Sequence, residues 1–167
     1  DFEDKDKGGY FFTSNNHEKL FYRPKSISDD SIPSGLVLAT DVLLQMGYLS
    51  GEKIFIDSAY NSISYINKSF GDNMTSSVSA INMLRDDTLE REIIIIRTEK
   101  KFWKEISKKK SCYKKYIVFI DNHERNLPAS ISSKKPKDIF TAYVCNGMTC
   151  SKPILSLDEF LKFINEK

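Results

Sequence analysis

Glu92-Ile93-Ile94-Ile95-Ile96-Arg97-Thr98, residues 92–98, decides the fold of the second half of the chain. Four consecutive isoleucines are typical of a strand that is buried on both faces. Residues 116–120, Tyr-Ile-Val-Phe-Ile, form a second run of this kind. Between the two runs, apolar residues four positions apart predict a helix over residues 99–110, which Thr98 is expected to cap. A strand, a helix and a strand in this order favour a parallel pair of strands.

The remainder of the second half is predicted to add two strands and a terminal helix. Residues 140–145 are expected to form a third strand, and residues 153–155 a short fourth. Residues 122–138 are rich in proline, serine and basic side chains, and this composition predicts a mobile loop. A capping box of Ser156 and Glu159 begins the terminal helix. The second half is therefore predicted to be a small α/β layer.

The first half of the chain is predicted to be an N-terminal β-hairpin followed by antiparallel helices. Aromatic runs at residues 10–12 and 20–22 flank a polar stretch, which is typical of a hairpin. Ser34 is expected to cap the first helix, which is apolar on most of its circumference and therefore buried. Apolar spacing and glycine stops predict three helices, over residues 34–47, 50–71 and 75–84. The predicted fold class is thus mixed α and β.

Charge and composition place this fold in a broad class. Residues 1–91 carry nine Lys and Arg against fourteen Asp and Glu, whereas residues 92–167 carry sixteen against nine. This asymmetry indicates two units, over residues 1–90 and 91–167. The content of 40% hydrophobic and 29% charged residues is that of a globular protein, and the longest apolar run is far shorter than a membrane span. Three cysteines and the lack of a basic-then-apolar leader predict a cytoplasmic protein with reduced thiols and no membrane contact.

Complete catalytic motifs are missing from the sequence. It contains no Gly-rich phosphate loop, no His-Glu-x-x-His and no Gly-x-Ser-x-Gly. No cofactor and no metal are therefore expected, and whether the chain is an enzyme stays open. The Lys-rich stretch over residues 100–115 fits the solvated side of an amphipathic helix better than a phosphate-binding surface, so nucleic acid is not an expected partner.

The sharpest local motif is Cys145-Asn146-Gly147-Met148-Thr149-Cys150. Its four intervening residues match neither a dithiol oxidoreductase nor a standard zinc knuckle. The Asn-Gly pair favours a tight turn, which would bring the two sulfurs close together. A disulfide or redox pair, and a metal site that adds Cys112 and His123, are the alternatives to two buried thiols. We predict two free thiols that serve packing and turn geometry, because an intracellular compartment keeps thiols reduced.

Opposed charges gather in the loop before the first helix. Arg23 and Lys25 precede the adjacent pair Asp29-Asp30, and the loop has no periodicity of its own. A loop of this kind, anchored by neighbouring elements, is a common place for binding a polar substrate. The alternative is a solvated loop whose aspartates help to cap the helix.

Two stretches of the chain resemble one known family. They comprise Gly8 to Phe11, His17 to Lys25 and Pro33-Ser34-Gly35, and then Thr141 to Cys145, Thr149-Cys150 and Pro153. In order and spacing they are similar to the thioredoxin-domain-containing, spermatogenesis-associated family. The resemblance implies the C-terminal part of such a protein: the end of an (α/α)6 toroid of the six-hairpin-glycosidase type and an α/β tail, without the N-terminal thioredoxin-like domain. The chain departs from the family where Leu36 and Val37 replace Asn and Ser, and where Asp30 replaces a common Gly.

The resemblance also implies where a site would lie. Loops and helix starts line the concave end of such a toroid, so Arg23, Lys25 and Ser34 would bind substrate and Asp29 would be the candidate acid or base. The substrate would be a carbohydrate or another polar small molecule. Glycoside hydrolysis usually needs two carboxylates, so the site would be incomplete here and would need the missing N-terminal part of the protein. The alternative is a non-catalytic scaffold or protein-interaction module that works with the thioredoxin-like domain.

Overall fold

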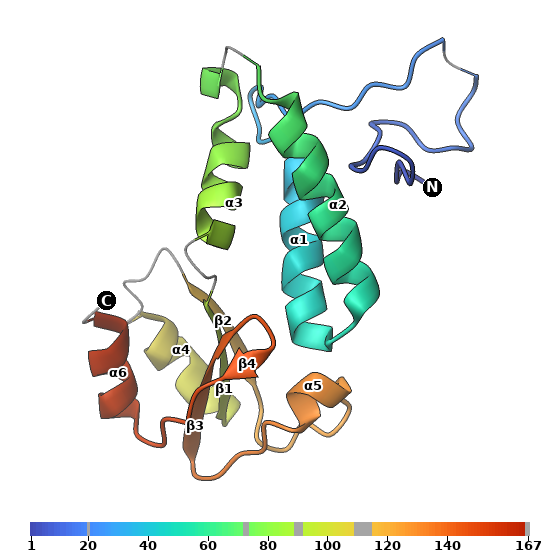
Figure 1. Ribbon diagram of the computed structural model, residues 1–167. Coiled ribbons are helices and arrows are strands. Elements are labelled where there is room, and N and C mark those ends of the chain that lie inside the picture. Colours follow the sequence, from blue (N-terminus) through green and yellow to red (C-terminus); the bar gives the residue numbers. More distant parts are fainter. Residues whose placement is uncertain (20, 72–73, 89–91, 109–114, 166–167) are drawn as a thin grey trace. The chain divides into compact units, whose positions relative to one another are not determined.

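The computed structural model describes residues 1–19, 21–71, 74–88, 92–108 and 115–165. The chain divides into two compact units, Asp1–Thr88 and Leu89–Lys167, and each is described by itself. The first unit is helical, and the second is built on a four-stranded sheet (Figure 1). The predicted mixed α and β class is confirmed.

The first unit is an α-helical hairpin with a third helix packed against it. Its helices are α1 (Gly35–Ser50), α2 (Lys53–Ser69), the 3-10 helix η1 (Met74–Ser76) and α3 (Val78–Thr88). The turn between α1 and α2 is so short that the two helices run antiparallel (Figure 1). Their shared core includes the fully buried residues Leu44, Ala59, Ile66 and Ala80.

The predicted end of the first helix at Gly47 is wrong. Helix α1 continues to Ser50 and ends at Gly51, which has a φ of 78° and donates its amide hydrogen to the Gly47 carbonyl (2.8 Å). Gly47 is buried, and a Cβ atom at this position would clash with the side chain of Ile56 in α2. This glycine therefore serves the close approach of two helices rather than a helix end.

The predicted β-hairpin over residues 10–22 is wrong for the described part of this segment. The first aromatic run pairs with the start of the chain instead, because Tyr10 forms an isolated bridge with Glu3. The amide of Phe12 donates to the carbonyl of Pro24 (2.9 Å), and Phe12 itself is 84% exposed. The aromatic side chains thus lack the common buried face that would hold two strands in register.

The second unit contains a mixed sheet and three helices. In chain order its elements are β1 (Glu92–Thr98), α4 (Lys100–Lys108), β2 (Lys115–Ile120), α5 (Ala129–Ser132), β3 (Phe140–Asn146), β4 (Thr149–Cys150) and α6 (Leu157–Asn165). The strand order is β2-β1-β3-β4, with β1 parallel to β2 and antiparallel to β3. The predicted β-α-β arrangement with a parallel pair is confirmed.

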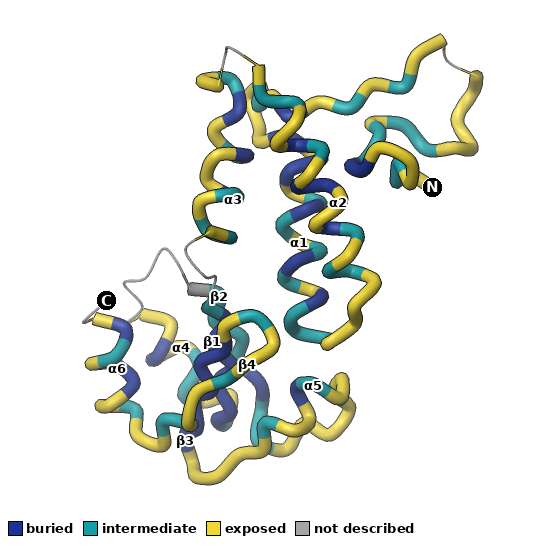
Figure 2. Tube along the Cα trace, in the orientation of Figure 1, coloured by how far each residue is buried: buried dark blue, intermediate teal, exposed yellow. Residues whose placement is uncertain are grey.

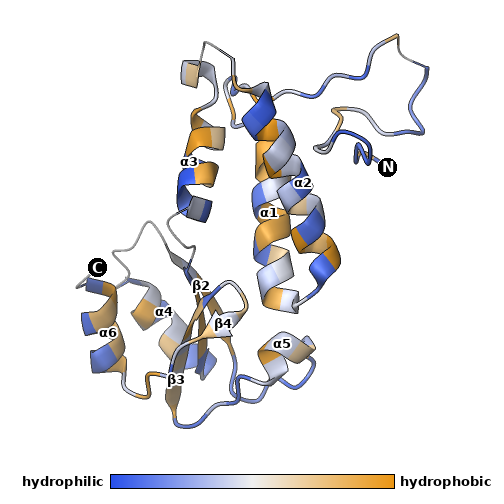
Figure 3. Ribbon diagram, viewed as in Figure 1, coloured by the Kyte–Doolittle hydropathy of each residue, from blue (hydrophilic) through white to orange (hydrophobic). Residues whose placement is uncertain are grey.

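Strand β1 is the centre of this unit. Ile94 pairs with Ile117 of β2 on one side and with Val144 of β3 on the other. Every residue of β1 after Glu92 is buried, as expected for a strand covered on both faces (Figure 2). Helices α4 and α6 contribute Ile106 and Phe160 to the core of one face. Helix α6 accordingly carries hydrophobic and hydrophilic residues on different sides (Figure 3).

Four local predictions for this unit need correction or completion. Helix α4 is capped by the carboxylate of Asp121, which accepts from the Lys100 amide (3.2 Å), while the buried hydroxyl of Thr98 has no hydrogen-bond partner among the described residues. The short fourth strand is β4, because Ile154 forms only an isolated bridge with Ala142. The predicted loop over residues 122–138 contains the one-turn helix α5. The end of the predicted helix over residues 99–110 lies outside the described residues.

The predicted free thiols are wrong as well. Cys145 and Cys150 are joined by a disulfide, with their Cα atoms 3.9 Å apart. The two cysteines are directly opposite each other in the β3–β4 pair, and Gly147 in the turn between them has a φ of 54°. The tight turn predicted from Asn146-Gly147 therefore brings the sulfurs into bonding distance, and strand pairing holds them there.

We expect Phe160→Ala to destabilise the chain by about 3–5 kcal/mol, since this ring is fully buried and packs on Phe140 with ring centroids 5.5 Å apart. Denaturant unfolding followed by circular dichroism measures the loss. Lys162→Ala is the matched control, because Lys162 is an exposed residue of the same helix. Equal stability of the two variants would contradict the packing described for α6.

Candidate functional site

The start of α1 positions the first predicted site residue, Ser34. Its hydroxyl accepts from the Val37 amide (3.4 Å) and donates to the carbonyl of Ser26 (2.7 Å). The hydrogen bond from the Val37 amide confirms the predicted helix cap, and Ser34 itself is buried. The second hydrogen bond ties the preceding loop to the helix and fixes the path of the chain from Ser26 into α1.

Asp29 joins the starts of two helices. Its carboxylate accepts from the amide of Ser34 (3.0 Å), one residue before α1, and from the amide of Ser79 (2.7 Å) in the first turn of α3. The Ser79 hydroxyl donates to the same carboxylate. One negative charge thus satisfies free amides and the positive dipole ends of both helices.

These contacts control the ionisation of Asp29. Burial alone would raise the pKa of the Asp29 carboxyl. Hydrogen bonds from Ser79 and from the Ser34 amide outweigh this effect, so the pKa lies below the usual 3.8. An aspartate held ionised in this way is a poor proton donor at neutral pH. The geometry therefore agrees with the capping alternative for Asp29 rather than with a general acid.

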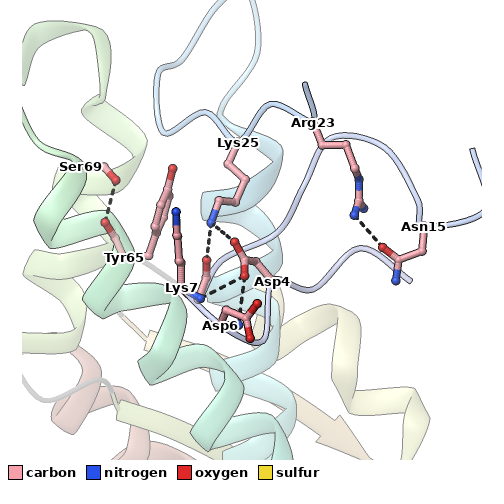
Figure 4. A network of polar contacts seen from close by, with 9 residues as sticks. Asp4, Asp6, Lys7, Asn15, Arg23, Lys25, Tyr65 and Ser69 are labelled. Carbon is pink, nitrogen blue, oxygen red and sulfur yellow. Dashed lines mark hydrogen bonds and ion pairs between the residues drawn. The ribbon is translucent and has the colours of Figure 1, made fainter. Parts of the chain in front are cut away.

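Lys25 lies in a closed polar network between the N-terminal segment and α2 (Figure 4). Its ammonium group forms an ion pair with Asp4 (2.6 Å) and donates to the carbonyl of Gly8 (2.9 Å). The side chains of Lys25 and Asp4 are only 8% and 11% exposed. The hydrogen bond from Lys25 and those from backbone amides lower the pKa of Asp4. The ammonium nitrogen also lies 3.9 Å from the centre of the Tyr65 ring in α2.

Gly8 makes this network possible. It has a φ of 79°, and a Cβ atom at this position would clash with the backbone carbonyl of Asn61 in α2. Only glycine allows the turn to approach the helix so closely. The N-terminal segment is therefore fastened to α2 by the close approach of Gly8 to Asn61 and by the contact of the Lys25 ammonium group with the Tyr65 ring.

Arg23 is also engaged within the chain. Its guanidinium donates to the Asn15 side chain (2.6 Å), as Figure 4 shows. It also donates to the carbonyl of Thr13 (2.5 Å) and stacks over the Phe11 ring at 4.0 Å. The Lys25 ammonium lies 5.2 Å from the same ring. The structure thus brings Arg23 and Lys25 together around Phe11, while Asp29 and Ser34 form a second group at the helix starts.

A pocket of about 710 Å³ opens beside the start of α1. Aromatic and aliphatic side chains form most of its wall, with three serines and one aspartate among them. The lining residues are Phe2, Tyr10, Phe11, Phe12, Ser26, Ser28, Asp30, Ile32, Pro33, Ser34, Gly35, Leu36 and Ala39. Its size and composition are those of small-molecule sites, which combine apolar walls with a few polar groups.

Ser34 is the one member of the predicted set among the described residues that line this pocket. Of the adjacent aspartates, Asp30 lines it and Asp29 does not, because Asp29 is used by the helix starts. Sequence reasoning missed the aromatic wall, although the run Tyr10-Phe11-Phe12 carries the signal. Leu36 contributes an apolar side chain to the pocket at the start of α1.

Elsewhere in the described residues, no three His, Cys, Asp or Glu side chains come together as a metal site would require. No described helix has the length and apolarity needed to cross a bilayer. Comparison of the chain with protein-family models, curated proteins and solved structures finds no significant match.

We expect Asp29→Ala to lower the free energy of unfolding by about 1–3 kcal/mol, because it removes a cap shared by two helices. Chemical denaturation at neutral pH measures the change. The adjacent exposed residue supplies the control, since Asp30→Ala should leave stability within about 0.5 kcal/mol of the original chain. A larger effect at Asp30 than at Asp29 would overturn the capping role.

The contacts of Asp29 also make the stability of the chain depend on pH. The pKa of Asp29 is lowered on folding, so its contribution to stability is complete above the unfolded value of 3.8 and is lost as the pH falls through the lower folded value. We therefore expect the stability difference between the original chain and Asp29→Ala to shrink below about pH 3.8. Urea titrations at neutral and acidic pH provide the measurement, and a difference that grew in acid would refute the lowered pKa.

Proposed function

We propose that the first unit is a binding module for a small carbohydrate and that the ligand occupies the pocket beside α1. The observation that carries this proposal is the pocket itself, in which aromatic rings stand beside hydroxyl groups and a carboxylate. A sugar ring presents apolar C–H faces and a polar hydroxyl edge. Aromatic side chains match the faces, and serine and aspartate oxygens match the edge.

The polar groups of the pocket are placed for recognition. Asp30 and Ser28 are exposed residues in the loop before α1, and a carboxylate accepts strong hydrogen bonds from hydroxyl groups. Ser34 is less available, because its hydroxyl is already bonded to Ser26 and Val37. We therefore assign the polar contacts to Asp30 and Ser28, and the apolar contacts to Phe12 and Ile32, which are also exposed.

The pocket lining supports carbohydrate binding better than glycoside hydrolysis. Asp30 is the one carboxylate among the described residues that line the pocket, whereas glycoside hydrolysis usually needs two carboxylates on opposite sides of the bond. A catalytic role would need a second carboxylate from a further part of the protein. The resemblance to a toroid-containing family implies such a further part of the protein. The α1–α2 helical hairpin is the kind of element from which a toroid is built, and this supports placing the unit at the end of one.

A second candidate is the protein-interaction module expected as the alternative. Leu38, Val42 and Met46 are exposed and lie four residues apart, so they form an apolar stripe along α1. A further part of the same protein, including a thioredoxin-like domain, is a suitable partner for such a stripe. We keep the cytoplasmic location as part of this proposal, although the Cys145–Cys150 disulfide is unusual in that compartment.

Saturation-transfer NMR with a panel of mono- and disaccharides tests the carbohydrate proposal. We expect one or more sugars to receive saturation and to shift the amide signals of Gly35 and Ala39. Asp30→Ala and Phe12→Ala should each weaken binding about tenfold, a loss of about 1.4 kcal/mol that is typical of one contact to a charged or aromatic group.

Phe21→Ala is the matched control for the aromatic variant. Phe21 belongs to the same N-terminal segment and is fully exposed, but it is not among the lining residues. It should bind sugar as the original chain does. If no sugar shifts the signals of the pocket, or if Phe21→Ala weakens binding as much as Phe12→Ala, the carbohydrate proposal fails.

Sedimentation analysis tests the second candidate. An exposed apolar stripe should cause association that increases with protein concentration, and Val42→Glu should abolish it by placing a charge in the centre of the stripe. Asn67→Glu, on an exposed position of α2, adds the same charge away from the stripe and should leave association unchanged. A monomer at all concentrations would remove this support for an interaction surface.

A further inference from the structure

The disulfide of the second unit joins a buried cysteine to a partly exposed one. Strand β4 forms the edge of the described sheet, so the Cys145–Cys150 bond joins an inner strand to an edge strand. Cys145 is only 4% exposed, whereas Cys150 is partly exposed and lies between the exposed residues Thr149 and Ser151. Because thiol–disulfide exchange requires access to a sulfur atom, the more exposed residue, Cys150, is the better placed of the two for attack.

The bond also lies at the start of a segment that a small number of backbone hydrogen bonds connects to β3. The β3–β4 pair comprises two residue pairs, Cys145 with Cys150 and Asn146 with Thr149. Beyond them, the amide of Ser151 donates to Val144 (2.9 Å) and the amide of Ile154 donates to Ala142 (2.9 Å). The chain then enters α6 at its cap, Ser156, whose hydroxyl accepts from the Glu159 amide (3.3 Å). The disulfide thus fixes the path from β3 to the helix that supplies Phe160 to the core.

We propose that the Cys145–Cys150 disulfide is a reversible redox site that an external dithiol opens at Cys150, and that its state sets the order of the segment from β4 to α6. The observations that carry the proposal are the edge position, the unequal exposure of the two cysteine residues and the short strand pairing. A reversible bond also reconciles a disulfide with a reducing compartment, where such bonds are transient.

The exchange follows a balanced course. A thiolate of the dithiol attacks the Sγ atom of Cys150 and forms a mixed disulfide, and the Cys145–Cys150 bond breaks with its electron pair on the Sγ atom of Cys145, which takes up a proton. The second thiol of the reductant, as thiolate, then attacks its own sulfur in the mixed disulfide and releases Cys150, which is protonated in turn. The protein gains two electrons and two protons, and the dithiol becomes a disulfide.

Alkylation and mass spectrometry test the chemistry on the full chain carrying Cys112→Ser, so that only the two cysteines of the hairpin are counted. We expect no free thiol in the oxidised chain, two after dithiothreitol treatment without unfolding, and return of the disulfide on reoxidation. Limited exposure to glutathione should place the mixed disulfide on Cys150. Peptide mapping of the alkylated original chain gives the same answer if Cys112→Ser does not fold.

Hydrogen exchange tests the structural consequence. The amides of Ser151 and Ile154 should exchange at least tenfold faster in the reduced chain, and a Cys145→Ser/Cys150→Ser chain should behave like the reduced form with or without dithiol. Three results would overturn the proposal: a bond that resists dithiol until the chain unfolds, glutathione found on Cys145, or equal exchange rates in the two redox states. Each outcome is independent of sugar binding in the first unit.

Discussion

The shared cap formed by Asp29 is the interaction on which the first unit depends. Helix N-termini carry partial positive charge and unsatisfied amides, so a carboxylate between two of them stabilises their approach. Asp29 supplies that anion to the starts of α1 and α3, and its own backbone amide donates to Ser76 (2.6 Å) in the turn before α3. The loop before α1 is thereby held at both ends, by Asp29 and by the Ser34–Ser26 bond.

A rigid loop explains how adjacent residues take different roles. Asp29 is used by the scaffold, and Asp30 is left on the pocket side of the loop. Arg23 and Lys25 similarly stabilise the N-terminal segment, where they hold Phe11 in place as part of the pocket wall. The charged residues that look most like a site in the sequence thus support the loop and the N-terminal segment, and less conspicuous aromatic residues line the pocket.

Local signals in the sequence were enough for much of the fold. The isoleucine run, the helix between two apolar runs and the Ser34 cap depend on neighbours in the chain, and the structure contains all three. The failures involve distant partners. From the sequence alone, Gly47 is predicted to end a helix, because its contact with Ile56 is not visible there. Thr98 is likewise predicted to cap α4, because the contact of Asp121 with the helix start is not visible. Periodicity and turn residues carry no information about such contacts.

The candidate site was predictable to a smaller extent for the same reason. The charge pattern pointed to a loop that lines the pocket, but it could not distinguish Asp29 from Asp30, because their difference lies in the distant residue Ser79. The cysteine motif indicated a tight turn, yet the exposure of each sulfur depends on the position of β4 at the sheet edge. Both distinctions follow from tertiary contacts rather than from residue type.

Carbon-13 NMR titration of the aspartate carboxyl groups tests the central claim most directly. If Asp29 caps both helices, its carboxyl carbon titrates with a midpoint below 3.8, and the amide signals of Ser34 and Ser79 shift with the same midpoint. A midpoint at or above 3.8, or amide signals that do not follow it, would contradict the shared cap and the pocket geometry built on it.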